Sequence, residues 1–134
     1  MLKYYYLNQN NILEIKNSFL FIIPTLNSYS RLPTLVDSLI KQNYENWRVI
    51  FIDGKSSSQH KRYLSNVCKN NKNFFWFNQD KNTKGIYGAM NTGLRKAKKN
   101  EWIFFWGSDD LPSHLKVMHL INKLINEYSI KQKK

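Results

Sequence analysis

The sequence predicts an α/β domain of three layers, in which a mostly parallel sheet lies between two layers of helices. Short apolar runs alternate along the chain with segments of about 10 to 15 residues whose apolar side chains recur at helical spacing. The runs are continuously apolar, as is typical of parallel strands buried on both faces. Right-handed crossovers then place helices on both sides of the sheet. A length of 134 residues without a linker rich in Pro, Gly or Ser predicts a single domain over residues 1–134.

The elements follow from the periodicity in chain order. Apolar runs bounded by turn residues predict strands at 19–24, 47–52, 74–77 and 102–106. Helical spacing predicts helices over 32–40, 60–70 and 85–99, and a last amphipathic helix beyond Ser113 with apolar positions from Leu115 to Tyr128. Residues 1–17 form a polar, Tyr-rich leader for which no helix or strand is predicted.

The charge is strongly basic, with 21 Lys and Arg against 9 Asp and Glu and a net charge of +12. Such an excess suits nucleic acid, an anionic membrane surface or a phosphate-bearing ligand, although lysines spread along the chain also fit compositional drift. No nucleic-acid-binding motif accompanies the charge, and the aromatic residues fall on predicted strands where core packing explains them. A nucleic-acid partner is therefore not expected. Cys68 is the single cysteine, which excludes an internal disulfide and fits a reducing cytosol.

Polar residues follow three of the predicted strands, at the edge where ligands bind in open parallel sheets. Turn chemistry alone also selects Asp, Gly and Ser, so the argument depends on the three groups together. The candidates are, at the end of the first strand, Pro24, Thr25 and Asn27; after the second, Asp53, Gly54 and Ser56; and after the fourth, Ser108, Asp109 and Asp110.

These groups suit a nucleotide diphosphate. The Asp53 carboxylate can accept the imide N–H of a uracil, and backbone N–H groups of residues 54–58 suit an anion. Asp109 and Asp110 offer hard oxygen ligands for Mg²⁺ or Mn²⁺, which would bridge to the phosphates. The sequence contains neither GxGxxG nor GxxxxGK[ST], which argues against Rossmann dehydrogenases and P-loop enzymes.

Four segments in correct order resemble family-2 glycosyltransferases of the GT-A fold, which is a Rossmann-like fold for nucleotide-diphospho-sugar transferases. They are FIIPTLN at 21–27, VIFIDGKS at 49–56, KGIYGAMNTG at 84–93 and the strand and turn at 102–110. The third resembles the KGIYDAMNKG segment of a subgroup that builds cell-surface polysaccharides. Four positions depart from the family pattern by lacking a carboxylate: Gly107, Ser58, Gly88 and Thr83.

The resemblance implies a role for each matching residue. Thr25 and Asn27 would line the nucleotide pocket, and Asp53 would contact the base. The segment around Gly85, Met90 and Asn91 would pack beneath the nucleotide sugar; Asp109 would bind Mg²⁺ or Mn²⁺, with Asp110 beside it.

The resemblance implies that a sugar is transferred with inversion from a nucleotide diphosphate to a saccharide or lipid-linked acceptor. The first candidate for the donor is a UDP-sugar. The implied localisation is cytoplasmic, and peripheral association with the inner face of the membrane is an alternative. The family's general base lies downstream of the segments that match, so we expect it to be absent and the 134-residue chain alone to be inactive. Two alternatives stay open: a truncated or degenerate copy that binds nucleotide without catalysis, and a basic nucleic-acid-binding module.

Overall fold

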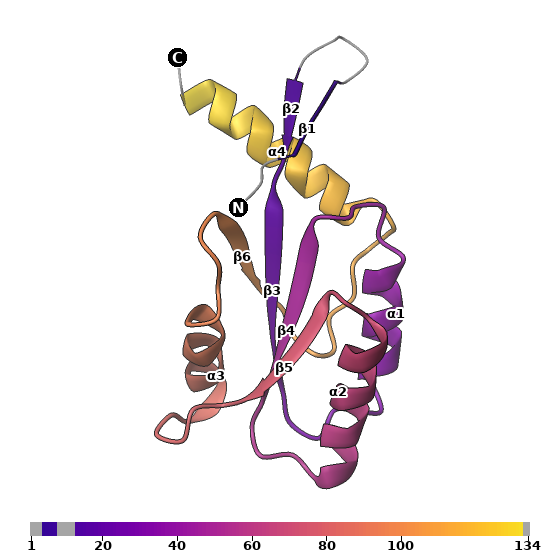
Figure 1. Cartoon of the computed structure of the whole chain (residues 1–134), viewed down its shortest axis with the longest axis vertical. Helices are drawn as coiled ribbons and strands as arrows, with labels where there is room; N and C mark the ends of the chain where they lie inside the picture. The colour runs from indigo at the N-terminus through magenta and orange to yellow at the C-terminus, as the bar shows by residue number, and fades with distance from the viewer. Residues whose placement is uncertain (1–3, 8–12, 133–134) are drawn as a thin grey trace.

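A four-stranded parallel sheet forms the centre of the protein (Figure 1). The computed structural model describes residues 4–7 and 13–132. The strand order is β5-β4-β3-β6, and every pairing in this sheet is parallel. The strands are β3 (Ser18–Thr25), β4 (Trp47–Asp53), β5 (Phe74–Asn78) and β6 (Glu101–Phe105). The four predicted strands are therefore confirmed within one residue at each end.

Helices cover both faces of this sheet, because the two faces of the central strands are both apolar. Phe19, Phe21 and Ile23 of β3 pack with residues of α1 (Leu32–Ile40), α2 (Ser58–Asn70) and α4 (Val117–Gln132). Leu20 and Ile22 point to the other face and pack with Ala89 of α3 (Gly85–Leu94). In Figure 1, α3 lies on the opposite side of the sheet from α1 and α2. The three-layer arrangement is thus confirmed.

An additional hairpin occupies part of the N-terminal leader, for which no regular structure was predicted. Strands β1 (Tyr4–Leu7) and β2 (Leu13–Lys16) pair in antiparallel fashion and lie beside α4 (Figure 1). The Asn126 side chain of α4 donates to the Ile15 carbonyl at 2.8 Å, and the Asn17 amide donates to Asn122 Oδ1 at 2.9 Å. The leader is therefore attached to the C-terminal helix by amide side chains.

The third helix is shorter than predicted, since it ends at Leu94 rather than at Lys99. Residues 95–100 turn back toward β6 instead. Arg48 donates to the Lys96 carbonyl at 2.8 Å, and Glu101 accepts from the Lys98 amide at 2.6 Å. Asn100 adopts a left-handed backbone with φ of 71°. These contacts outside the helix stabilise the turn, although the sequence of residues 95–99 continues the helical pattern.

Core packing explains the aromatic residues of the central strands but only part of those on the edge strands. Phe75 and Phe77 of β5 and Trp102 and Phe105 of β6 are each at least 37% exposed. The expectation that strand aromatics are core residues is therefore wrong at these four positions. Strands β5 and β6 are the outer strands of the sheet, and α3 contacts mainly the central strands β3 and β4 on its face. In the described residues, no helix combines the length and the apolar character needed to cross a membrane.

Candidate functional site

The register of the sheet brings the ends of three strands to the same level. Thr25 of β3 pairs with Asp53 of β4, and Asp53 pairs with Asn78 of β5. Beyond these pairs, the Gly54 amide donates to the Thr25 carbonyl at 2.9 Å, and the Gln79 amide donates to the Asp53 carbonyl at 2.8 Å. The polar residues at the carboxyl edge therefore form one connected region rather than separate turns.

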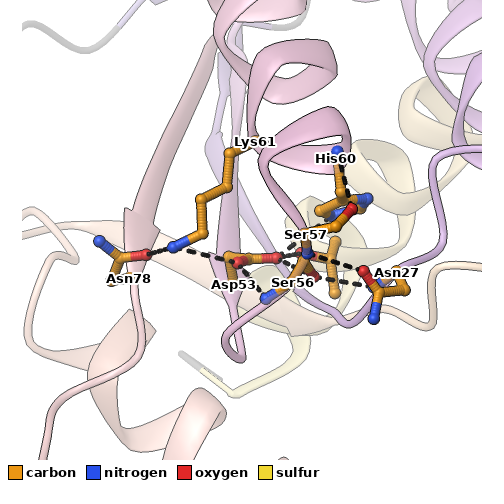
Figure 2. A network of polar contacts seen from close by, with 8 residues as sticks. Asn27, Asp53, Ser56, Ser57, His60, Lys61 and Asn78 are labelled. Atoms are coloured by element: carbon orange, nitrogen blue, oxygen red, sulfur yellow. Dashed lines mark hydrogen bonds and ion pairs between the residues drawn. The ribbon is translucent and has the colours of Figure 1, made fainter.

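The Asp53 carboxylate is the centre of a hydrogen-bond network, shown in Figure 2. Its Oδ1 accepts from Ser56 Oγ at 2.6 Å and from Thr25 Oγ1 at 3.1 Å, while its Oδ2 accepts from the Ser56 amide at 3.0 Å. The residue is buried. Both oxygens are thus engaged by the protein, and the carboxylate fixes the loop that follows β4.

Asn27 connects that loop to the end of β3. The Asn27 amide donates to Ser56 Oγ at 2.8 Å, and Asn27 Oδ1 accepts from the Ser57 amide at 2.9 Å (Figure 2). Asn27 and Lys55 both have left-handed backbones, with φ of 47° and 68°. Ser57 in turn caps α2, because its Oγ accepts from the His60 amide at 3.3 Å. Two of the predicted site residues, Asn27 and Ser56, are therefore brought together.

Two residues in the first turn of α2 face the same carboxylate (Figure 2). His60 is fully buried, with Nε2 at 3.2 Å from Asp53 Oδ1. Burial lowers the pKa of His60 below its ordinary 6.5 and outweighs the attraction of Asp53, so the imidazole is neutral at pH 7. Lys61 Nζ donates to Asn78 Oδ1 at 3.0 Å and lies 3.9 Å from Asp53 Oδ2. The sequence patterns did not single out either residue.

A pocket of about 420 Å³ opens beside this network, at the ends of β4 and β5 and the start of α3. Ammonium groups dominate its charged lining, which includes Lys55, Lys61, Lys81 and Lys84 together with Asp53 and Asp80. Helix α3 begins here at Gly85, with φ of 66°, and its N-cap residue supplies no side-chain cap. Lysines and free helical N–H groups both favour an anion in this pocket.

The other predicted site residues lie at differing distances along these elements. Gly54 and Gly85 line the pocket directly. Pro24 lies within β3, one residue before Thr25. Met90 and Asn91 are further along α3 and are not among the residues that line the pocket. The structure therefore joins Gly85 to the strand-end network and places Met90 and Asn91 outside it.

The predicted metal ligands lie in the turn after β6. The Gly107 amide donates to Asp110 Oδ2 at 3.1 Å, and Trp106 Nε1 donates to the Asp110 carbonyl at 2.9 Å. A Cβ built on Gly107 would be 3.1 Å from Asp109 Oδ1 and 2.6 Å from Asp110 Oδ2, so both carboxylates converge on this glycine. No cluster of three or more His, Cys, Asp or Glu suited to a metal occurs in the described part of the chain. The two carboxylates fit part of a hard cation's ligand set, which phosphate oxygens would complete.

The parallel α/β/α sheet with its polar site at the carboxyl edge superposes on solved glycosyltransferase structures of the GT-A fold, so this protein has the GT-A fold. The family model described as "Glycosyl transferase family 2" matches residues 20–130. The chain therefore belongs to glycosyl transferase family 2.

Curated relatives agree with this assignment. A PGL/p-HBAD biosynthesis glycosyltransferase of Mycobacterium bovis (strain BCG / Pasteur 1173P2) is 32% identical over 92 residues, which cover 69% of this chain and 35% of the relative. An uncharacterized glycosyltransferase of Haemophilus influenzae is 28% identical over 109 residues, or 81% of this chain and 43% of the relative. The match thus spans about a third to two-fifths of these relatives.

Solved structures share the fold. The S. aureus TarS fragment 1–349, solved with UDP, superposes with a TM-score of 0.71 at 25% identity. The alignment covers 82% of this chain and 32% of the TarS fragment. The mannosyltransferase PcManGT from Pyrobaculum calidifontis, solved with GDP-Man and Mn²⁺, gives a TM-score of 0.68 at 19% identity. It covers 83% of this chain and 32% of its own, and at this identity the likeness concerns the fold alone.

Proposed function

We propose that this chain binds the nucleotide of a nucleotide-diphosphate sugar, with a UDP-sugar as the first candidate. It would form the donor-binding portion of an inverting glycosyltransferase that acts on a saccharide or lipid-linked acceptor in cell-surface polysaccharide biosynthesis. The observation that carries the proposal is the lysine-lined pocket at the carboxyl ends of β4 and β5, which is tied to the Thr25–Asp53 network. TarS, which has this fold, has been solved with UDP and with UDP-GlcNAc.

The pocket supplies the interactions that a nucleotide diphosphate needs. The ammonium groups of Lys55, Lys61, Lys81 and Lys84 offset the negative charge of the phosphates and attract the ligand from solution. The Asp53 network keeps the loop after β4 in one conformation, so little entropy is lost there on binding. A pocket of about 420 Å³ is within the usual range for small-molecule sites.

A divalent cation, Mg²⁺ or Mn²⁺, belongs to the same proposal. Asp109 and Asp110 would hold it, and the ion would neutralise a leaving diphosphate. The protein's own part is to place both carboxylates beside Gly107: the Gly107 amide holds Asp110 by a hydrogen bond, and Asp109 Oδ1 lies next to the same glycine. The basic charge would also suit work at the cytoplasmic face of a membrane, where lipid-linked acceptors are found.

Calorimetry with UDP and uridine tests the donor proposal. We expect UDP to bind more tightly than uridine, because the lysines interact with the phosphates. Lys61→Met should weaken UDP binding about threefold to tenfold and leave uridine binding nearly unchanged. Lys69→Met, at the exposed far end of α2, is the matched control. Equal affinities for UDP and uridine in the unchanged protein would contradict the proposal.

A further inference from the structure

Resting on the proposed nucleotide site, we propose that Gln79 reads the base. Its carboxamide would recognise the edge of uracil at which an N–H lies next to a C=O. The residue follows β5 directly and lines the pocket. Its backbone is fixed to β4, because the Gln79 amide donates to the Asp53 carbonyl at 2.8 Å.

The orientation of the carboxamide is determined by one hydrogen bond. Gln79 Nε2 donates to the Gly85 carbonyl at 3.2 Å, at the start of α3. Because a carbonyl only accepts hydrogen bonds, the nitrogen must face Gly85. The oxygen then lies on the side of Gly54, where a Cβ built on that glycine would be 3.6 Å from Gln79 Oε1. The carboxamide keeps one N–H and its oxygen for a ligand.

Glycine at position 88 makes this placement possible. A Cβ on Gly88 would be 2.5 Å from Gln79 Nε2, nearer than real Cβ atoms approach, and 2.8 Å from the Cβ of Thr83. Any side chain at position 88 would therefore displace Gln79 from its present position. Gly54 and Gly88 therefore leave free the space beside them in which the Gln79 carboxamide lies.

The other carboxylates and the other carboxamide in the pocket each have at least one partner. Asp53 accepts from Ser56 and Thr25, as described above. Asn78 Oδ1 accepts from Lys61, and the Asp80 carboxylate is paired with Arg95. Within residues 4–7 and 13–132, no donor contacts Gln79 Oε1. Gln79 therefore provides an acceptor that a base N–H can use without breaking an existing contact, and its carboxamide also keeps an N–H beside that oxygen.

The chemistry of the bases makes this a selective reader. Uracil presents N3–H beside O4, which pairs with the oxygen and the free N–H of a carboxamide. Cytosine presents the reverse pattern, an acceptor N3 beside a donor amino group. Reading cytosine would require the carboxamide to flip and lose its bond to Gly85. Guanine has an N–H beside a C=O, so it shares the uracil pattern, and the test must separate the two.

The experiment measures the affinities of UDP, CDP and GDP by calorimetry on four proteins: the unchanged chain, Gln79→Met, Gly88→Ala and the control Asn82→Ala. Met keeps the volume of Gln79 without its polar groups, and Gly88→Ala displaces the carboxamide while leaving Gln79 in the sequence. Asn82 is exposed and does not line the pocket. Circular dichroism establishes that each variant is folded.

We expect the unchanged chain and Asn82→Ala to bind UDP at least about tenfold more tightly than CDP. In Gln79→Met and Gly88→Ala, the ratio of the two affinities should fall to near one. An undiminished ratio in Gln79→Met or in Gly88→Ala, with UDP still bound, overturns the inference and leaves the proposed function intact. Absence of nucleotide binding to the unchanged chain overturns both. If GDP binds more tightly than UDP, the proposed nucleotide becomes a guanosine diphosphate instead of a uridine diphosphate. In that case, a loss of the preference for GDP over CDP in Gln79→Met still supports the role of Gln79.

Discussion

Arg48 and Glu101 form a bidentate ion pair that joins β4 to β6 across β3. Arg48 Nε lies 2.7 Å from Glu101 Oε2, and Arg48 Nη2 lies 2.7 Å from Glu101 Oε1. The side chains are 14% and 3% exposed. Because Arg48 also donates to the Lys96 carbonyl, the pair fixes the turn between α3 and β6 at the edge of the sheet opposite to the candidate site.

Glu101→Gln should lower the free energy of unfolding at pH 7 by about 3 kcal/mol, because it leaves Arg48 mostly buried without its counter-charge. Chemical denaturation measures this difference. Asp37→Asn, which removes an exposed pair with Lys41, is the control and should cost about 0.5 kcal/mol or less. Equal losses of unfolding free energy from the two substitutions would mean that the buried ion pair stabilises the protein no more than the exposed one.

The same pair predicts a pH dependence. Burial by itself raises the pKa of Glu101, but hydrogen bonds from Arg48 and the Lys98 amide outweigh it, so the pKa lies below the ordinary 4.5. The contribution to stability is therefore complete above about pH 4.5 and is lost as the pH falls through the lowered pKa. The difference in unfolding free energy between the unchanged protein and Glu101→Gln should narrow in this acid range. A difference that stays constant down to the acid unfolding of the protein would contradict the assignment.

Gly93→Ala should destabilise the protein by about 1 to 3 kcal/mol, although alanine is the better helix former. A Cβ at this position would lie 3.0 Å from Ile22 Cδ1 and still closer to Ile22 Cγ2, so α3 would have to move away from β3. Thermal and chemical unfolding of Gly93→Ala, Ile22→Ala and the double variant test this cause. The loss in the double variant should be smaller than the sum of the single losses; strict additivity would exclude the contact.

Asp53→Ala should lower both stability and UDP affinity, each by about 1 to 3 kcal/mol, since it removes the acceptor for Ser56 and Thr25 and releases the loop. Calorimetry and thermal unfolding on the same samples measure the two effects. This comparison separates two roles for the carboxylate. Weaker UDP binding at unchanged stability would indicate direct contact with the base, whereas losses in both support its positioning role.

Mn²⁺ should bind measurably only when UDP is present, because Asp109 and Asp110 provide few ligands and phosphate oxygens must supply others. Titrations of Mn²⁺ with and without UDP measure this coupling, and Asp109→Asn should remove it. Asp37→Asn serves again as the charge-matched control. Tight Mn²⁺ binding to the nucleotide-free protein would show that other ligands are involved.

The central elements could be predicted from the sequence because their signals are local. The run around 19–24 is apolar without interruption and ends near turn residues, and the strand is found at Ser18–Thr25. The helix at 32–40 was predicted in the same way and is confirmed. Hairpin β1–β2 could not be predicted, because its attachment depends on bonds such as Asn17 to Asn122, which are 105 positions apart.

The strand-end residues Thr25, Asn27 and Asp53 could also be proposed from sequence, because parallel strands bring their carboxyl ends to one edge. Gln79 was not among the predicted site residues, although it follows the end of β5 at the same edge. The space for its carboxamide depends on Gly54 and Gly88, which lie on two other elements. No local pattern contains that information.

The Thr25–Asp53–Asn78 alignment has a consequence for how this site tolerates changes in chain length. Successive side chains of a strand point to opposite faces, so one residue inserted within β4 would turn Asp53 away from Ser56 and Thr25. It would also move the β4 side chains on one side of the insertion to the opposite face of the sheet. An insertion at Lys72, an exposed residue in the connection between α2 and β5 at the opposite edge, would leave that alignment unchanged. Evolution and engineering can thus lengthen the loops remote from this edge, while the length of each strand leading to it must be conserved.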